Sequence, residues 1–322
     1  MKKCTFLVIV LVTIFRWGYG QQEPIYSQYI INPFTINPAV AATEDYYDLQ
    51  MGYRSQWARL SGAPRSVYLS GHGTINKPFY HQHYKAEKRN WHGVGFQLLD
   101  DRLGPQQRNT VLLAYSYNMK LAPKTRLSVG TFVGFKSFKV NASHWENLDD
   151  PTDAVFNADL TTGLVPEVQF GAVLYNEDDY FVDVSIQNLT GGNRAFREVD
   201  LNFADADYKV HSYFSAGKTF RAFKEVYITP STLVRYVPGI SLSADINAKF
   251  DVFDDYWAGV SVRTTKAFNV FAGLNLVDKF DLTFAYEYDT NILNQVQSGT
   301  FEIIVGLRLQ HPRVIMNPQF WD

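Results

Sequence analysis

Histidine and serine side chains are the residues of this sequence that could perform hydrolytic chemistry. The candidates on predicted strands are His72, His92 and His211, with Ser66, Ser70 and Ser212. A nucleophile and its base are recognised by three-dimensional geometry, and no spacing in the sequence marks such a pair. We therefore predict no catalytic residues and no enzyme. The alternative, an outer-membrane hydrolase, would depend on one of these histidines.

His81 and His83 form a His-x-His pair that could contribute two ligands to a metal site. Structural and catalytic metal sites use three or four protein ligands, and neither cysteine nor a further histidine lies nearby. The pair is more typical of a solvated loop. We predict no metal and no cofactor.

Charged residues occur about once per predicted strand, on the polar side of each. They are Arg54, Arg65, Asp183, Asp245, Lys249, Arg263, Glu287, Glu302 and Arg308. A porin for one class of ion would favour a single sign at its constriction, whereas here the signs are mixed. We predict that these side chains face a narrow lumen and form ion pairs across it.

The elements that position these charges are predicted to be β-strands. In "GTFEIIVGLRL", residues 299–309, large apolar side chains alternate with Glu302 and Arg308. Similar alternation recurs from residue 46 to 309 and gives about 14 strands separated by turn residues. They begin near Tyr46, Arg65, Trp91, Arg108, Thr125, Pro166, Tyr180, Tyr208, Glu225, Ile240, Asp255, Ala267, Phe280 and Gly299. The predicted fold is all-β, a transmembrane antiparallel outer-membrane β-barrel.

Composition favours this barrel over a soluble β-sandwich. The 322 residues include 24 Phe, 20 Tyr and 6 Trp, yet the mean hydropathy is only −0.19. An apolar band with aromatic girdles around a polar lumen gives such a balance. The polar face is rich in Gly, Ser, Asn, Thr and Gln, whereas the outer face of a sandwich commonly carries Lys and Glu. The net charge of −2 offers no basic patch for nucleic acid.

The N-terminus has the features of an export signal. Lys2 and Lys3 precede an apolar stretch, and "GYG" at residues 18–20 resembles a cleavage site. Residues 1–20 are therefore predicted to be a signal peptide that exports the chain, and with the predicted barrel this places the protein in the cell outer membrane. Cys4, the single cysteine, lies within it, so the mature chain is expected to have no disulfide and no lipid anchor.

Residues 21–45 are expected to form an N-terminal plug or periplasmic segment ahead of the barrel, which spans residues 46–309. The stretch "EPIYSQYIINPFTINPAVAA" is apolar and does not alternate. We predict turns at its two Asn-Pro steps and a position inside the lumen or across the periplasmic mouth. The candidate contact residues in it are Tyr26, Ser27, Gln28, Tyr29, Asn37 and Pro38.

Connection lengths predict which end of the barrel is periplasmic. Short turns at residues 122–124, 176–179, 251–254 and 277–279 fall on the N-terminal side, and the long connections at 141–165, 188–207 and 290–298 fall on the outer side. Residues 310–322 are then a periplasmic C-terminal tail. One long periplasmic connection, residues 74–90, is either a flexible excursion or a docking surface that uses His81, His83, Lys85 and Arg89. At the first outer turn, Trp57, Pro64 and Arg65 are candidate contact residues.

Several stretches resemble the PorP/SprF family of Bacteroidetes outer-membrane proteins. The most specific are "YSQYIINPFTINPAVAA" (residues 26–42) and "YRSQWARLSGAPRSVYLSGHG" (53–73). Others are "DDRLGP" (100–105), "YSYNMKL" (115–121), "FVDVSIQNL" (181–189), "PSTLVRY" (230–236), "DINAKF" (245–250), "GVSVRT" (259–264) and "GTFEI" (299–303). The likeness covers essentially the whole mature chain.

The resemblance implies a non-enzymatic component of type IX secretion. Such barrels work with periplasmic and lipoprotein ring components, and some support the secretion or surface anchoring of gliding adhesins through the C-terminal domain of the cargo. The expected partners are therefore the cargo C-terminal domain, the secretion machinery and outer-membrane lipid. The alternative is a passive or solute-specific porin.

Overall fold

The computed structural model describes residues 29–44, 46–75, 90–140, 160–161, 164–176, 179–190, 209–240, 242–253, 255–265, 267–276, 279–290 and 295–309. The predicted signal peptide, residues 76–89 of the predicted docking connection, much of the long outer connections and the C-terminal tail lie outside these ranges.

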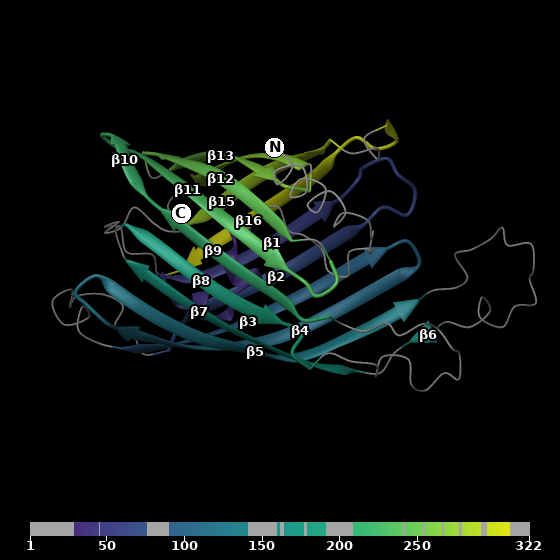
Figure 1. Cartoon of the computed structure of the whole chain (residues 1–322), viewed down its shortest axis with the longest axis horizontal. Coiled ribbons are helices and arrows are strands. Elements are labelled where there is room, and N and C mark those ends of the chain that lie inside the picture. The colour runs from purple at the N-terminus through teal and green to yellow at the C-terminus, as the bar shows by residue number, and fades with distance from the viewer. Residues whose placement is uncertain are drawn as a thin grey trace, which may run out of the picture.

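The described strands run in sequence order around a single sheet (Figure 1). The first half contains β1 (Tyr47–Ser55), β2 (Arg65–Thr74), β3 (Trp91–Leu103), β4 (Gln106–Lys120), β5 (Thr125–Val140), β6 (Leu160–Thr161), β7 (Val165–Asn176) and β8 (Tyr180–Gln187). The second half contains β9 (His211–Lys218), β10 (Phe220–Phe223), β11 (Val226–Tyr236), β12 (Ser243–Val252), β13 (Tyr256–Arg263), β14 (Ala267–Leu276), β15 (Phe280–Asp289) and β16 (Thr300–Leu309).

The sheet closes on itself because β1 pairs with both β2 and β16. The short strand β6 lies off the main path, and β9 and β10 follow one another along the same neighbour, β11. The wall is therefore a closed antiparallel barrel of 14 strands, as the sequence predicts. Closure leaves no sheet edge with unpaired backbone groups, which is what a strand structure needs in order to span a lipid bilayer.

Alternation along each strand separates an interior face from an exterior face, and the predicted assignments on β12 and β16 are confirmed. On β16, Glu302, Ile304 and Arg308 are buried, whereas Phe301, Ile303, Val305 and Leu309 are exposed. On β12, the buried residues are Ser243, Asp245, Asn247 and Lys249. The period of two that is visible in the sequence thus decides which side chains enter the lumen.

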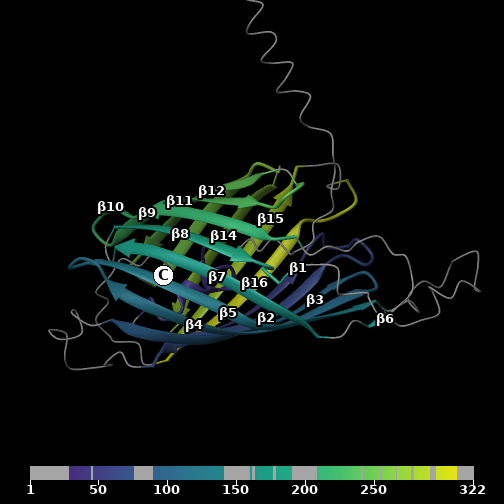
Figure 2. The same ribbon diagram turned by 60° about the horizontal axis from the view of Figure 1, so that its bottom comes forward.

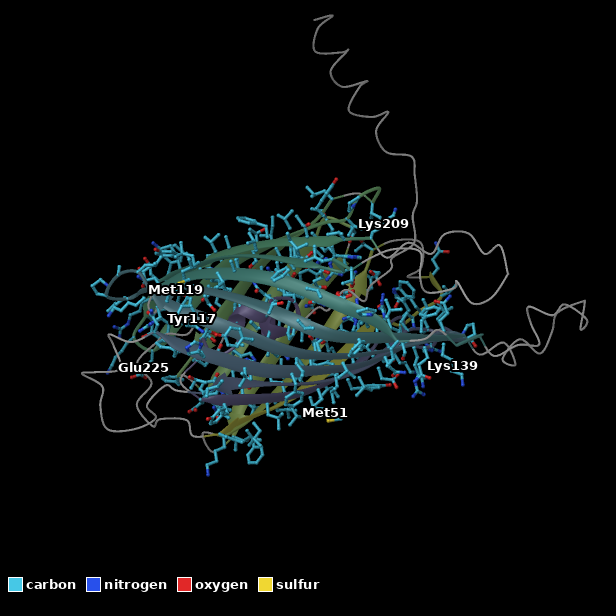
Figure 3. The ribbon with its side chains drawn as sticks, turned by 90° about the horizontal axis from the view of Figure 1, so that it is seen from below. Met51, Tyr117, Met119, Lys139, Lys209 and Glu225 are labelled. Atoms are coloured by element: carbon cyan, nitrogen blue, oxygen red, sulfur yellow. The ribbon has the colours of Figure 1, made fainter. Side chains whose placement is uncertain are left out.

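The exterior carries the apolar side chains that a bilayer requires. Met51, Leu113, Val133 and Ile246 are each more than half exposed on the outside of the barrel. Figure 3 shows side chains projecting outward along the whole wall, with Met51 on the outer surface between the two ends. Aromatic rings add to this surface, as where Tyr286 packs against Phe301 at 5.1 Å between ring centroids.

Two short 3-10 helices, η1 (Pro33–Thr35) and η2 (Pro38–Val40), lie inside the barrel. In Figures 1 and 2 they form the purple trace enclosed by the strands. Among the described residues, no helix has the length and apolar character needed to cross a membrane.

Candidate functional site

The segment formed by residues 29–42, here called the lumen segment, takes its local shape from two Asn-Pro steps. Pro33 and Pro38 occupy the first positions of η1 and η2, where a missing backbone N–H costs nothing. The Asn37 side chain caps η2 by accepting a hydrogen bond from the Ala39 N–H at 3.0 Å. The turns predicted at both Asn-Pro steps are therefore present.

The lumen segment is buried as deeply as the core of a soluble domain. Phe34, Ala39 and Ala41 are each 0% exposed. The Phe34 ring packs between His72 of β2, at 4.6 Å, and Phe132 of β5, at 5.0 Å between centroids. Burial of this apolar surface stabilises docking of the segment against the wall.

Polar side chains of the wall satisfy the carbonyl groups of the lumen segment. The Ala41 carbonyl accepts hydrogen bonds from Ser116 Oγ at 2.6 Å and from Asn118 Nδ2 at 3.3 Å. The Ala39 carbonyl accepts one from Ser128 Oγ at 2.5 Å. The Ile36 carbonyl accepts two, from Ser185 Oγ at 2.7 Å and from Gln187 Nε2 at 3.0 Å. A buried carbonyl without a partner would be costly, so these donors stabilise the non-strand backbone inside the barrel.

Side chains of the segment bind the wall in turn. Asn37 Nδ2 donates to Asp183 Oδ1 on β8 at 3.2 Å, and Asn32 Nδ2 donates to Ser70 Oγ on β2 at 2.9 Å. On the opposite wall, Asn247 Nδ2 of β12 donates to the Tyr29 hydroxyl at 2.6 Å. The segment is thus bonded to strands on several sides of the lumen.

Glycines in the wall leave the space that the segment occupies. A Cβ at Gly130 of β5 would lie 2.7 Å from the Pro38 carbonyl oxygen and 2.8 Å from the Ala39 nitrogen. A Cβ at Gly171 of β7 would lie 1.9 Å from Asn37 Oδ1. Side chains at these positions would therefore exclude the segment from its observed place.

A continuous chain of ion pairs lines one side of the lumen, along the wall from β11 to β1. It links Glu302 to Arg54 (3.1 Å), Arg54 to Glu287 (3.4 Å), Glu287 to Arg263 (3.1 Å), Arg263 to Asp245 (3.1 Å) and Asp245 to Arg235. These residues lie on β16, β1, β15, β13, β12 and β11, and all are buried. Three cations alternate with three carboxylates, so each buried charge has an opposite neighbour.

The prediction of internal ion pairs is confirmed for most of the charged set, but the pairs join nearby strands of the wall, or two positions on one strand, and do not span the lumen as predicted. Arg308 pairs with Asp281 at 2.6 Å, Lys249 pairs with Asp251 at 2.8 Å, and Asp183 bonds Asn37. For Arg65 the prediction is wrong. Arg65 is exposed and shares the outer face of β2 with Val67, because its inward neighbour in the alternation is Ser66.

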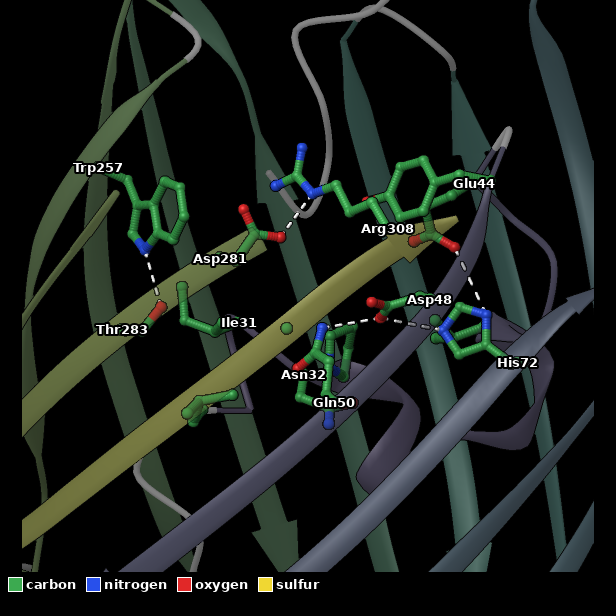
Figure 4. Close-up of a pocket in the computed structure, with 15 residues that line it drawn as sticks. Ile31, Asn32, Glu44, Asp48, Gln50, His72, Trp257, Asp281, Thr283 and Arg308 are labelled. Atoms are coloured by element: carbon green, nitrogen blue, oxygen red, sulfur yellow. Dashed lines mark hydrogen bonds and ion pairs between the residues drawn. The ribbon is translucent and has the colours of Figure 1, made fainter. Parts of the chain in front are cut away.

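A small polar cavity of about 30 Å³ remains between the lumen segment and the wall. Figure 4 shows His72 between Glu44 and Asp48, with the Arg308–Asp281 pair across the cavity and Ile31 and Asn32 at its edge. His72 Nδ1 is 3.8 Å from Glu44 Oε2, and Nε2 is 3.6 Å from Asp48 Oδ2. A cavity of this size and polarity suits one or two water molecules, not an organic substrate.

The three strand histidines do not form a hydrolytic site with the predicted serines. His92 faces outward, with Nδ1 at 2.6 Å from the Tyr115 hydroxyl. His211 Nδ1 bonds Asn188 Nδ2 at 3.0 Å, and His72 lies in the cavity above. Within the described ranges, no group of three or more His, Cys, Asp or Glu side chains is placed to hold a metal ion.

The structure describes some of the predicted contact residues and not others. Tyr29, Asn37 and Pro38 are buried in the lumen, whereas Trp57, Pro64 and Arg65 lie at or next to the β1–β2 turn. Trp57 has a left-handed backbone (φ 50°), and its indole N–H donates to Asp289 Oδ2 at 3.0 Å. The other candidates, Tyr26, Ser27, Gln28, His81, His83, Lys85 and Arg89, lie outside the described residues.

No sequence pattern marks the wall residues that hold the lumen segment. Ser116, Ser128 and Ser185 had the right type and the right face, since each occupies an inward position on its strand. Their partners are backbone carbonyls about 75 to 150 residues away in sequence, and no local pattern identifies those. Glycine at inward positions of β3, β5 and β7 was the one signal that a second segment lies close to the wall.

The chain matches the model of one protein family, and its fold is similar to several solved outer-membrane barrels. The model of the family "Type IX secretion system membrane protein PorP/SprF" matches residues 19–307. No curated protein matches the chain. Among solved structures, the chain is similar to a FadL homologue of Pseudomonas aeruginosa (TM-score 0.47, 12% identity, 90% of this chain and 94% of that one). It is also similar to the Acinetobacter baumannii outer membrane protein Omp33 (TM-score 0.46, 7% identity, 82% and 99%).

Proposed function

Because the chain belongs to the family of type IX secretion system membrane proteins PorP/SprF, we propose that it is a non-enzymatic outer-membrane component of that system. In this proposal it supports the secretion or surface anchoring of cargo proteins, such as gliding adhesins, through their C-terminal domain. It also contacts periplasmic ring and lipoprotein components. The family match over residues 19–307 is the observation that carries the proposal.

The occupied lumen favours the function of a scaffold over that of an open porin. The lumen segment is bonded to strands around the wall, and the ion-pair chain places long charged side chains in the lumen along the wall from β11 to β1. A general porin needs a water-filled path lined by side chains that leave it open. We therefore propose that the lumen segment acts as a plug and that cargo uses the outside or the ends of the barrel.

Three regions are proposed as contact surfaces. Residues 26–42 form the plug, residues 74–90 form a periplasmic dock, and the long connections at the opposite end hold cargo. Trp57, Pro64 and Arg65 belong to that same end. Trp57 is fixed by its bond to Asp289, so its side chain has a defined direction, as a recognition surface requires.

Affinity purification of the tagged full-length chain from native membranes tests the proposal. We expect ring components and at least one protein with a secretion C-terminal domain to co-purify. A variant with residues 76–89 replaced by a short Gly-Ser turn should lose the periplasmic partners and keep its barrel fold. Recovery of neither class of partner from membranes that contain an active secretion system would contradict the proposal.

Charge substitution separates the proposal from the porin alternative. Asp245→Asn and Glu287→Gln each remove one carboxylate of the lumen without a large change of shape. A porin should change its conductance or ion selectivity in a planar bilayer, whereas a plugged secretion component should change only its resistance to unfolding. A large single-channel conductance in the unsubstituted protein, sensitive to either variant, would favour the porin.

A further inference from the structure

The outer face of the barrel carries a row of cations at the end where β1 turns into β2. The pairing register places Arg65 of β2 directly opposite Arg102 of β3, Arg102 opposite Gln107 of β4, and Gln107 opposite Lys139 of β5. Directly opposed residues on one face of an antiparallel pair have Cβ atoms about 5 Å apart. Figure 3 shows Lys139 at this end of the barrel, far from Tyr117, Met119 and Glu225 at the other end.

A polar step separates this row from the apolar band of the barrel wall on β3 and β4. Towards the middle of the barrel, the next outward residues are Val67 on β2, Asp100 on β3 and Asn109 on β4, and Leu98 and Val111 follow them. The apolar side chains of Val67, Leu98 and Val111 are 37%, 39% and 51% exposed. The acyl chains of a lipid would lie on these side chains. The cations then stand beyond the acyl region, at the depth where lipid headgroups begin, and long Arg and Lys side chains reach that level readily.

Within the described part of the chain, Arg65 is the cation of this row that the protein leaves without a carboxylate partner. Asp100 accepts from Arg102 Nε at 3.0 Å and Nη2 at 3.1 Å, and also from Gln107 Nε2 at 3.0 Å. Among the described residues, Arg65 has no carboxylate within ion-pair distance, although it stands opposite another arginine. Like charges directly opposite on neighbouring strands are destabilising, so an anion bound beside Arg65 would relieve the repulsion.

We propose that Arg65, Arg102 and Lys139 form a binding site for the phosphate groups of an anionic lipid headgroup. The Arg65 guanidinium presents its N–H groups as a fork that matches two phosphate oxygens. Arg102, whose Nε and Nη2 bond Asp100, adds a second positive charge beside Arg65. Cations spread along the row as far as Lys139 suit a headgroup with more than one phosphate. The lipid is a bis-phosphorylated glycolipid such as lipid A, with its acyl chains along Val67, Leu98 and Val111. The site lies on the exterior, outside the lumen, and it shares Arg65 with the proposed cargo-contact residues of the first outer turn.

Native mass spectrometry tests this site. The purified full-length protein is titrated with lipid A in detergent micelles, and the complexes are measured after release from the micelles. The double variant R65Q/R102Q should lower the apparent affinity for lipid A about tenfold or more, because it removes two charge-assisted contacts. R221Q/K224Q removes two exposed cations from the β10–β11 hairpin at the opposite end and should keep the affinity within about twofold. Phosphatidylcholine should bind all three proteins equally.

Three results would overturn the proposal. They are unchanged lipid A binding in R65Q/R102Q, an equal loss in R221Q/K224Q, and displacement of lipid A by inorganic phosphate at equimolar concentration, which would identify a free-anion site. Heat-modifiable mobility on a gel confirms that each variant is folded. Arg65→Lys provides a second measurement: it keeps the charge but not the fork, so we expect an intermediate loss of affinity.

Discussion

Asn37 of the lumen segment donates to Asp183 Oδ1 on β8 at 3.2 Å, although 146 residues separate the two in sequence. The same amide nitrogen lies 3.2 Å from the Val184 carbonyl oxygen, while Asn37 Oδ1 accepts from the Ala39 N–H at 3.0 Å. One buried side chain therefore caps η2 and binds the wall. Docking of the segment and its internal turn depend on the same group.

Replacement of Asn37 by alanine should loosen the lumen segment. The change leaves Asp183 and the Ala39 N–H buried without these partners, which costs about 1–3 kcal/mol for each unsatisfied group. Hydrogen exchange followed by mass spectrometry should show faster exchange of peptides that cover residues 29–42. Asn109→Ala, at an exposed position on β4, is the matched control and should leave this exchange unchanged. Equal protection in N37A and the unsubstituted protein would contradict the anchoring role.

Gly130→Ala should displace the lumen segment by steric exclusion. Its Cβ would lie 2.7–2.8 Å from backbone atoms of Pro38 and Ala39, which cannot move aside as a flexible side chain can. We expect a measurable ion conductance in planar bilayers where the unsubstituted protein shows little. Gly306→Ala is the control, since its Cβ would meet the Asp281 side chain at 3.1 Å and not the segment. If G130A conducts no more than G306A, the segment does not limit passage through the lumen.

The barrel wall was predictable from sequence because its physical cause is local. Alternation along a strand directly assigns one face to lipid and the other to the lumen, as on β12 and β16. The rule fails near turns, as at Arg65, where a residue can be polar without facing inward. It also gives no distances, so the partner of each lumen charge had to come from the structure.

The contacts of the lumen segment were not predictable in the same way. Residues 29–42 have no period, and their burial depends on space left by Gly130 and Gly171 on distant strands. The bonds from Ser116, Ser128 and Ser185 end on backbone carbonyls, which every residue has. Side-chain types alone therefore could not identify which serines bind the segment.

Removal of Arg263 should destabilise the barrel strongly. Arg263 is the central cation of the lumen chain and bonds both Asp245 and Glu287, so Arg263→Ala leaves two buried carboxylates short of a partner. Breaking a buried ion pair by removing one member costs about 3–5 kcal/mol. Guanidinium unfolding in lipid vesicles measures the change.

The control for Arg263 is a surface ion pair on the same barrel. Lys218 lies 3.2 Å from Asp179, and both side chains are about half exposed. Lys218→Ala should change the free energy of unfolding by less than about 1 kcal/mol, because water screens the pair. A similar decrease in the free energy of unfolding in R263A and K218A would mean that the lumen chain of ion pairs does not stabilise the fold.

Trp57→Phe should loosen the β1–β2 turn without a change in the barrel. The Trp57 indole N–H donates to Asp289 Oδ2 at 3.0 Å, while backbone bonds join Ala58 to Gly299 (2.8 Å) and Ser298 (2.9 Å), so the turn is held against the β15–β16 connection. Phenylalanine keeps an aromatic ring but removes the donor, at a cost of about 1–3 kcal/mol. Hydrogen exchange of residues 56–64 should increase, whereas Trp257→Phe, which removes the bond to Thr283 within the lumen, should leave it unchanged.

The same variant tests whether this turn holds cargo, as proposed. Less cargo should then co-purify with W57F than with the unsubstituted protein. If the turn is loosened and the amount of cargo is unchanged, cargo binds elsewhere.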